Sequence, residues 1–265
     1  MNPRVVFALV LRHLFLYGRN WVRLVELFFW PTMELLVWGS LTLFLGSSGD
    51  ARAPQFVAYL IGGVIFWDIL FRSQQAVAIS FLEDVWTKNL MNIFVAPVRP
   101  SEYVAAGLVV GILRTGITVT LLTILAAVNY HFDLFQLQFS LIPFFGNLLI
   151  FGWSLGMISS ALILRWGQAA ESLAWAVPFL IQPAACVFYP LSTLPEWAQG
   201  IGKALPCTHV FEGMRAALDG KAFDWGQMGV SLALNAVWLA FAAGLYAWVL
   251  ESGRRRGMLT RVTSH

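Results

Sequence analysis

The chain is poor in charged residues. Asp, Glu, Lys and Arg make up 12% of its 265 residues, whereas soluble domains carry about 25%. Hydrophobic residues make up 58% of the chain, and the mean hydropathy is +0.71. A globule of this size has too few charges to cover so much apolar surface. The composition therefore excludes a soluble enzyme, a disordered tail and a nucleic-acid-binding protein, and it predicts an integral membrane protein.

Cysteine and histidine are also scarce, with two and four residues respectively. No C-x-x-C pair occurs, which excludes a disulfide framework and the usual zinc motifs. Cys207, His209 and Glu212 stand close together, but no fourth ligand accompanies them, so no metal is expected. The sequence leaves open whether Cys186 pairs with Cys207.

The chain lacks the phosphate-binding loop of ATPases, G-x-x-x-x-G-K-[ST]. The pair Gly202-Lys203 is followed by Ala204 instead of serine or threonine. The chain is therefore not expected to hydrolyse ATP or to hold a cofactor of its own. Residues 152–156 match the pattern G-x-S-x-G around Ser154, but a nucleophile elbow needs a strand-to-helix turn. Inside an apolar run, this spacing of small residues is typical of close helix packing.

Long apolar runs are abundant. A helix needs about 20 mostly apolar residues to cross a bilayer. Six runs meet this length, and they are continuous rather than alternating, so they predict helices and not strands. The predicted spans cover residues 24–45, 55–79, 103–129, 141–164, 172–191 and 227–250. The expected fold is an all-α membrane protein with six transmembrane helices in a single domain, and the prolines of the fifth span predict a kink there.

The distribution of Lys and Arg predicts the orientation, because these residues accumulate on the cytoplasmic side of a membrane. With six spans, both termini lie on one side. That side carries eleven of the seventeen cations, which are Arg4, Arg12, Arg19, Arg23, Lys88, Arg99, Arg165, Arg254, Arg255, Arg256 and Arg261. The opposite side carries Arg52, Lys203, Arg215 and Lys221. Both termini are therefore expected in the cytoplasm.

The first 23 residues predict an amphipathic helix lying at the cytoplasmic interface. At 100° per residue, the four arginines of this segment fall within an arc of about 100°. Val6, Phe7, Leu14 and Tyr17 lie on the opposite surface. The alternative is that this segment merely lengthens the first span.

Two connections between spans are longer than a simple turn requires. Residues 80–102 form a cytoplasmic segment with a short amphipathic helix, which Pro97 and Pro100 end. This helix is either a docking element or an interfacial helix with no partner. Residues 192–226, on the outer side, predict two short helices near 196–205 and 208–218, starting at Pro195 and Pro206. Their mixed composition favours helices that dip into the outer leaflet and return.

Charged residues inside spans are candidates for function. Asp68 and Arg72 stand one helical turn apart and are expected to neutralise each other. Glu34 and Arg114 have no partner on their own spans, so they either pair across helices or line a water-filled path. Several aromatic residues are candidates for stacking on a sugar or a lipid tail, although packing and interfacial belts explain them equally well. These are Tyr59, Phe66, Trp67, Trp175, Phe179 and Phe188.

The layout and two local motifs resemble the ABC type-2 exporter permeases. The first motif runs from Glu83-Asp84 through Leu90 to Val95-Ala96-Pro97-Val98-Arg99-Pro100. The second runs from Phe188-Tyr189-Pro190-Leu191-Ser192 through Leu194-Pro195 and Leu205-Pro206 to His209. The similarity covers essentially the whole chain. The branch that exports lipo-oligosaccharides, polysaccharides and drugs is the most similar.

This resemblance implies a bacterial inner-membrane protein that works as half of a transporter. A second copy would complete the pathway, and two copies of a separate cytoplasmic ATP-binding cassette subunit would bind ATP and Mg. The residues expected to couple the two subunits are Glu83, Asp84, Lys88, Leu90, Phe94, Pro97 and Arg99. The external helices would gate the exit with Pro195, Trp197, Pro206 and His209.

Three functions remain as hypotheses. The first is the exporter subunit, with a glycan, a glycolipid or a small amphiphile as substrate. The second is a secondary transporter or channel that acts without an ATPase. The lack of a clear inverted repeat and the small number of intramembrane charges argue against it. The third is a membrane-embedded enzyme that uses Ser154.

Overall fold

The structure is a computed structural model that describes residues 1–46, 53–86, 95–96, 98–167 and 171–255. Within these ranges the fold is all-helical, as predicted, with no strands. The α-helices are α1 (Pro3–Gly18), α2 (Trp21–Gly46), α3 (Ala53–Trp86), α5 (Pro100–Tyr130), α6 (Leu141–Trp166), α7 (Glu171–Ile181), α8 (Glu196–Lys203), α9 (Pro206–Leu218) and α10 (Trp225–Arg255). Two short 3-10 helices are η1 (Leu134–Ser140) and η3 (Leu191–Thr193).

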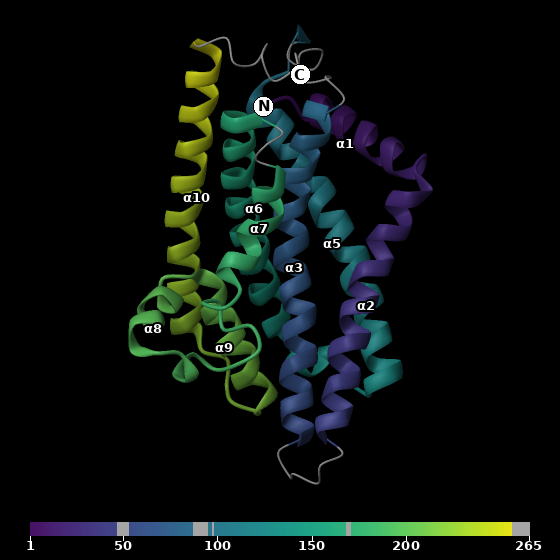
Figure 1. The fold of residues 1–265 in the computed structure, drawn as a ribbon, viewed down its shortest axis with the longest axis vertical. Helices are drawn as coiled ribbons and strands as arrows, with labels where there is room; N and C mark the ends of the chain where they lie inside the picture. The colour runs from purple at the N-terminus through teal and green to yellow at the C-terminus, as the bar shows by residue number, and fades with distance from the viewer. Residues whose placement is uncertain (47–52, 87–94, 97, 168–170, 256–265) are drawn as a thin grey trace.

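The helices α3 and α6 form the centre of the bundle. In their apolar segments, 67% of α3 and 78% of α6 is buried inside the protein, compared with 28% for α2, 33% for α5 and 22% for α10. Figure 1 shows α10 on one side of this central pair and α2 with α5 on the other. The outer helices therefore present most of their apolar surface to lipid or to another protein.

Small residues on α6 allow the two central helices to approach closely. A methyl group added at Gly152 would lie 1.7 Å from Ser73 Oγ, and one at Gly156 would lie 2.7 Å from Gln74 O. The Ser154 hydroxyl donates to the carbonyl of Ile150 in its own helix at 3.0 Å. Residues 152–156 are therefore a packing motif of small residues, as the sequence indicated.

Five helical segments are long and apolar enough to cross a membrane, namely Leu24–Phe44, Gln55–Ile79, Ser101–Tyr130, Leu134–Trp166 and Trp225–Ser252. They correspond to the first, second, third, fourth and sixth predicted spans. The predicted fifth span, 172–191, is wrong as a continuous helix. Helix α7 has 11 residues, or about 16 Å, which is too short for a hydrocarbon core of about 30 Å.

The prolines end the helix in this segment, whereas the sequence predicted only a kink. Pro178 is tolerated inside α7, but the helix ends at Ile181, two residues before Pro183. Proline has no N–H to continue the helical hydrogen bonds. The backbone then turns through Cys186, which has a positive φ of 56°, before it reaches η3.

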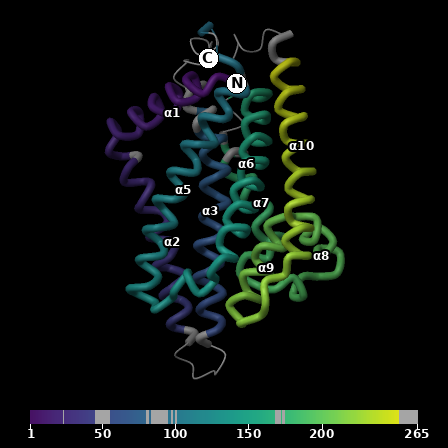
Figure 2. The backbone as a smooth tube through the Cα atoms, turned by 180° about the vertical axis from the view of Figure 1, so that it is seen from behind, coloured from purple at the N-terminus to yellow at the C-terminus, as the bar shows by residue number. Residues whose placement is uncertain are grey.

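The broken segment from α7 to α9 nevertheless carries the chain along the bundle. Helix α1 and the last turn of α10 lie at the same end, and the start of α10 lies at the opposite end (Figures 1 and 2). The chain therefore makes an even number of passages along the long axis. Four of the passages before α10 are single helices, and the segment 171–218 provides the remaining one.

Helix α1 is distinct from α2, because Arg19 caps the end of α1 and α2 begins at Trp21. It lies obliquely at the end of the bundle (Figure 1). Leu9, Val10 and Tyr17 are buried on its inner face against α5, whereas Phe7 and Leu14 are exposed. The first turns of the chain therefore present one apolar face to the protein and another outward.

Two boundaries of the connection between α3 and α5 differ from the prediction. Helix α3 continues seven residues past the predicted end at 79, since residues 80–86 contain no proline or glycine to stop it. Helix α5 begins at Pro100 and not at 103, because proline is well suited to the first helical position. Most of the predicted short helix lies outside the described residues.

Candidate functional site

An ion pair lies inside the predicted second span. Arg72 Nε donates to both carboxylate oxygens of Asp68 at 3.0 Å. The Asp68 side chain is 3% exposed and the Arg72 side chain 13%. The structure therefore contains the ion pair that the one-turn spacing predicted, and both partners lie on α3.

Glu34 of α2 adds a second carboxylate to this region. It is partly buried and lies close enough to Asp68 and Arg72 to interact with both electrostatically. Within the described residues the Arg72 ion pair is made to Asp68, and Glu34 has no ion pair. The ensemble of Glu34, Asp68 and Arg72 therefore carries one negative charge in excess when all three are ionised.

Two groups of aromatic rings involve the helices that carry these charges. Trp38, one turn along α2 from Glu34, stacks on Phe188 with a centroid distance of 4.7 Å. Phe179 of α7 packs against Trp67 at 6.2 Å and against Phe71 at 5.5 Å. Contacts between aromatic rings therefore connect α2 to the turn after α7, and α3 to α7.

Some of the predicted aromatic residues are buried in the core and others are exposed. Phe66 and Trp67 are only 1% and 2% exposed, and Phe66 packs on Phe144 of α6 in the core. Phe66 therefore lines no path. Trp175 and Phe179 of α7 are about half exposed, so they are available to a partner or a substrate.

Arg114 of α5 contacts helix α1. Its Nη1 donates to Tyr17 OH at 2.5 Å, and its guanidinium lies 4.4 Å from the centre of the Tyr17 ring. Of the two alternatives for Arg114, contact across helices is therefore the one found. This contact holds the end of α1 against the middle of α5.

Tyr59 belongs to a polar contact at the end of the bundle opposite the termini. Tyr59 OH and Gln55 Nε2, both on α3, donate to Asp219 Oδ1 at the end of α9. Lys221 lies near the other Asp219 oxygen at 3.8 Å. Tyr59 therefore joins α3 to α9 instead of standing free in a path.

The short helices α8 and α9 are close to their predicted positions. Pro195 is the N-cap of α8 and Pro206 is the first residue of α9. Trp197 is 75% exposed. His209 contacts Gln227 Oε1 of α10 and the Lys203 carbonyl at the end of α8, both at 3.0 Å, and a cavity of about 170 Å³ lies beside it. His209 therefore bridges three helices at this end.

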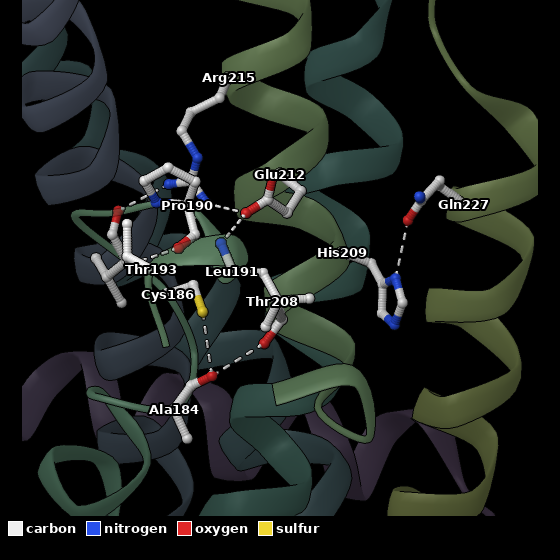
Figure 3. A network of polar contacts seen from close by, with 11 residues as sticks. Ala184, Cys186, Pro190, Leu191, Thr193, Thr208, His209, Glu212, Arg215 and Gln227 are labelled. Carbon is white, nitrogen blue, oxygen red and sulfur yellow. Dashed lines mark hydrogen bonds and ion pairs between the residues drawn. The ribbon is translucent and has the colours of Figure 1, made fainter. Parts of the chain in front are cut away.

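Side chains of α9 hold the non-helical turn before α8 (Figure 3). Glu212 Oε1 accepts the Leu191 N–H at 2.7 Å and pairs with Arg215 at 2.9 Å. Arg215 Nη1 donates to the Val187 carbonyl at 3.3 Å. Irregular backbone is tolerated at membrane depth only where protein satisfies its polar groups. No local sequence signal predicts these roles, because they depend on a fold that brings α9 beside the turn.

The hairpin of α8 and α9 reaches far along α10. Trp238 Nε1 donates to the Ala204 carbonyl between the two helices at 3.1 Å. Trp238 lies 13 residues after the start of α10, which is about 20 Å along that helix. The hairpin thus lies beside the lower half of α10 in Figure 1.

A buried polar cluster supports the hairpin from inside. Asn235 Nδ2 donates to Asn147 Oδ1 of α6 at 2.8 Å. The Ser231 hydroxyl lies 3.0 Å from the same oxygen and 2.9 Å from the Pro206 carbonyl. These contacts connect α6, α10 and the start of α9.

The candidate coupling residues are only partly described. Glu83 and Asp84 lie in the last turn of α3, and Arg99 is the N-cap of α5. Lys88, Leu90, Phe94 and Pro97 lie outside the described residues. Their role stays a prediction.

Sequence reasoning missed Glu102, which joins this connection to α1. Its carboxylate accepts the Asn2 N–H at 2.7 Å and the Arg99 N–H at 3.0 Å. A glutamate at the third position of a helix is a known capping signal, so the half of this role that caps α5 was readable from the sequence. The contact with Asn2 was not.

Cys186 and Cys207 are both free and buried. In the described part of the chain, no group of three or more His, Cys, Asp and Glu side chains is arranged to hold a metal ion. His209 faces α10 and Glu212 faces the turn before α8, so the sequence neighbours Cys207, His209 and Glu212 serve different contacts.

Comparison with known proteins finds relatives for most of the chain. Residues 4–218, from α1 to the end of α9, match the family described as ABC-2 type transporter. The "Inner membrane transport permease YadH" of Escherichia coli (strain K12) is 26% identical over 204 residues, which cover 75% of this chain and 77% of that protein. The "ABC transporter G family member 20" of Dictyostelium discoideum is 25% identical over 206 residues, which cover 74% of this chain and 26% of that protein.

Proposed function

We propose that this chain, which belongs to the ABC-2 type transporter family, is the membrane subunit of an ATP-driven exporter and works with a separate ATP-binding subunit. The observation that carries the proposal is the family match over residues 4–218. The absence of a phosphate-binding loop from the sequence agrees with an ATPase on another chain. The relative from Escherichia coli is called an inner membrane transport permease, and we assign this chain to the same membrane.

We place both termini in the cytoplasm. The arginines of α1, together with Arg99 at the start of α5 and Arg165 at the end of α6, belong to the end of the bundle that holds the termini. An excess of cations on one side supports a cytoplasmic location. The ATP-binding subunit then docks at this end, on the connection between α3 and α5 that carries Glu83 and Asp84.

A second copy of the chain completes the pathway in this proposal. Helices α2, α5 and α10 are the peripheral ones, and Glu34 lies near the middle of the apolar segment Leu24–Phe44 of α2. A carboxylate facing lipid is costly, and Arg114 of α5 is already covered by Tyr17 of α1. The face of α2 that carries Glu34 is therefore the one that a second copy covers, and the helices α8 and α9 close the outer end.

The substrate is an amphiphile that enters from the cytoplasmic side or the inner leaflet. The half-exposed rings of α7 suit the apolar part of such a molecule. A glycan or glycolipid and a small amphiphilic compound are both members of this class.

The test is co-expression with the ATP-binding cassette protein encoded next to this chain. We expect the two proteins to purify as one complex, and proteoliposomes holding the complex to transport an amphiphile only with ATP. The catalytic glutamate of the ATPase, replaced by glutamine, is the control for ATP dependence. Transport by the chain alone, driven by an ion gradient, would contradict the proposal and favour a secondary transporter.

A further inference from the structure

The charge balance beside α2 is incomplete. Asp68 and Arg72 neutralise each other through two contacts of 3.0 Å, and Glu34 remains without an ion pair within the described residues. An uncompensated carboxylate in the apolar part of a membrane is unfavourable. The site therefore suits a further cation, which no ion pair among the described residues supplies to Glu34.

A second copy is a poor source of that cation. Two copies related by a two-fold axis present the same face to each other. The α2 face of the partner would therefore bring another Glu34 and its local negative charge. Val37, three residues from Glu34 on α2, is exposed and apolar, as are Phe179 and Leu180 of α7. Dimerisation doubles the negative charge at the interface, so a second copy does not supply the compensating cation.

The surroundings of Glu34 suit an organic cation. Trp38 lies one turn from Glu34 and stacks on Phe188. Trp67 and Phe71, the sequence neighbours of Asp68 and Arg72 on α3, form a second group of rings with Phe179. Aromatic faces attract ammonium groups, and the attraction is strongest where water is excluded. A neutral sugar would instead require several hydrogen-bonding side chains at this place.

A buried amide extends the polar face of α3 toward the cytoplasmic end. Gln75 lies at i+7 from Asp68 and i+3 from Arg72, on the same side of the helix. It is 6% exposed, and neither its Oε1 nor its Nε2 has a hydrogen-bond partner in the described part of the chain. A buried amide without partners is unfavourable. Asp68, Arg72 and Gln75 together form a polar stripe about 10 Å long.

We propose that Glu34, the rings around it and this polar stripe form a recognition site for a positively charged amphiphile, with the ammonium group at Glu34. The proposal rests on the exporter function given above and names its substrate class. Glu34 is the binding residue, the rings of Trp38 and Phe179 contact the cation or its apolar body, and Gln75 lies on the route of the headgroup from the cytoplasmic side.

The experiment compares three detergents with the same dodecyl chain, each below its micellar concentration. The complex with its ATP-binding subunit is placed in lipid nanodiscs, and ATP hydrolysis is measured against dodecyltrimethylammonium, dodecyl maltoside and dodecyl sulfate. We expect the cation to stimulate hydrolysis at a concentration at least 10-fold lower than the two others. We expect Glu34→Gln to remove this preference and Glu34→Asp to retain part of it.

Glu26→Gln is the matched control, because Glu26 is an exposed carboxylate on the same helix. It is expected to respond like the unmodified complex. Each variant is also checked for co-purification with the ATP-binding subunit, and Glu34→Asp keeps the test valid if Glu34→Gln does not assemble. Equal stimulation by the sugar and the cation, or an unchanged preference in Glu34→Gln, would overturn the cation site. A failure of every amphiphile to affect hydrolysis, together with no ATP-dependent transport, would instead contradict the exporter function.

Discussion

At the scale of single residues, Asp68 and Arg72 form a buried ion pair in which each partner depends on the other. Removing one partner leaves a buried charge uncompensated, which typically costs about 3–5 kcal/mol, whereas replacing both with neutral groups is far better tolerated. We therefore expect Arg72→Gln and Asp68→Asn each to lower the thermal unfolding temperature in detergent. The double variant should recover most of the loss, and additive losses would contradict a direct pair.

Gly152 is a second position where one atom decides the packing. Glycine to alanine in a helix normally stabilises it by about 1 kcal/mol. At Gly152 the added methyl would meet Ser73 Oγ and the Leu70 carbonyl of α3, and overpacking costs about 1–3 kcal/mol. We expect Gly152→Ala to be destabilising by thermal unfolding. Gly146→Ala on the same helix, where the methyl meets nothing within 4 Å, should be neutral or slightly stabilising.

At the scale of elements, helix α1 is fastened to α5 at two places, by Glu102 near its start and by Arg114 at its end. The Glu102 carboxylate accepts from the backbone N–H groups of both Asn2 and Arg99. We expect Glu102→Ala to loosen the start of α1, so that its amides exchange with solvent about 10-fold faster in hydrogen-exchange mass spectrometry. Glu196→Ala, an exposed carboxylate on α8, should leave α1 unchanged, and equal exchange in both variants would show that Glu102 does not fasten it.

At the scale of the whole molecule, the orientation follows from charge and is testable by labelling. Val95, between α3 and α5, is 84% exposed, and Ala222, between α9 and α10, is exposed at the opposite end. In cells with a permeabilised outer membrane, an impermeant maleimide should label Ala222→Cys directly and Val95→Cys only after the inner membrane is opened. The reverse pattern would place the termini outside.

The proposed dimer is the second property of the whole molecule. Val37 on α2 and Val237 on α10 are 65% and 66% exposed, so both cysteine variants are equally accessible. Under mild oxidation in membranes, we expect Val37→Cys to form a disulfide-linked dimer and Val237→Cys to remain monomeric. The native cysteines are buried and should not interfere. Cross-linking through Val237 alone would move the interface to α10.

Much of the architecture was readable from the sequence. Apolar runs located five long helices, because hydropathy records directly which segments a membrane tolerates. The one-turn spacing of Asp68 and Arg72 predicted their ion pair, and Pro195 and Pro206 predicted the starts of α8 and α9. Each of these signals is local, so no knowledge of neighbouring helices was required.

The tertiary structure decided what local signals do not contain. Residues 172–191 are apolar enough to span a membrane, yet α7 ends at Ile181, and only the fold supplies Glu212 and Arg215 to satisfy the turn that follows. The fold also buries Phe66 in the core and brings Arg114 into contact with Tyr17. Asp68 and Arg72 pair with each other, and Glu34 has no ion pair among the described residues. Hydropathy and spacing along one chain fix which segments become helices. The partner of each polar group depends on which helices pack side by side, and that is settled only by the three-dimensional packing.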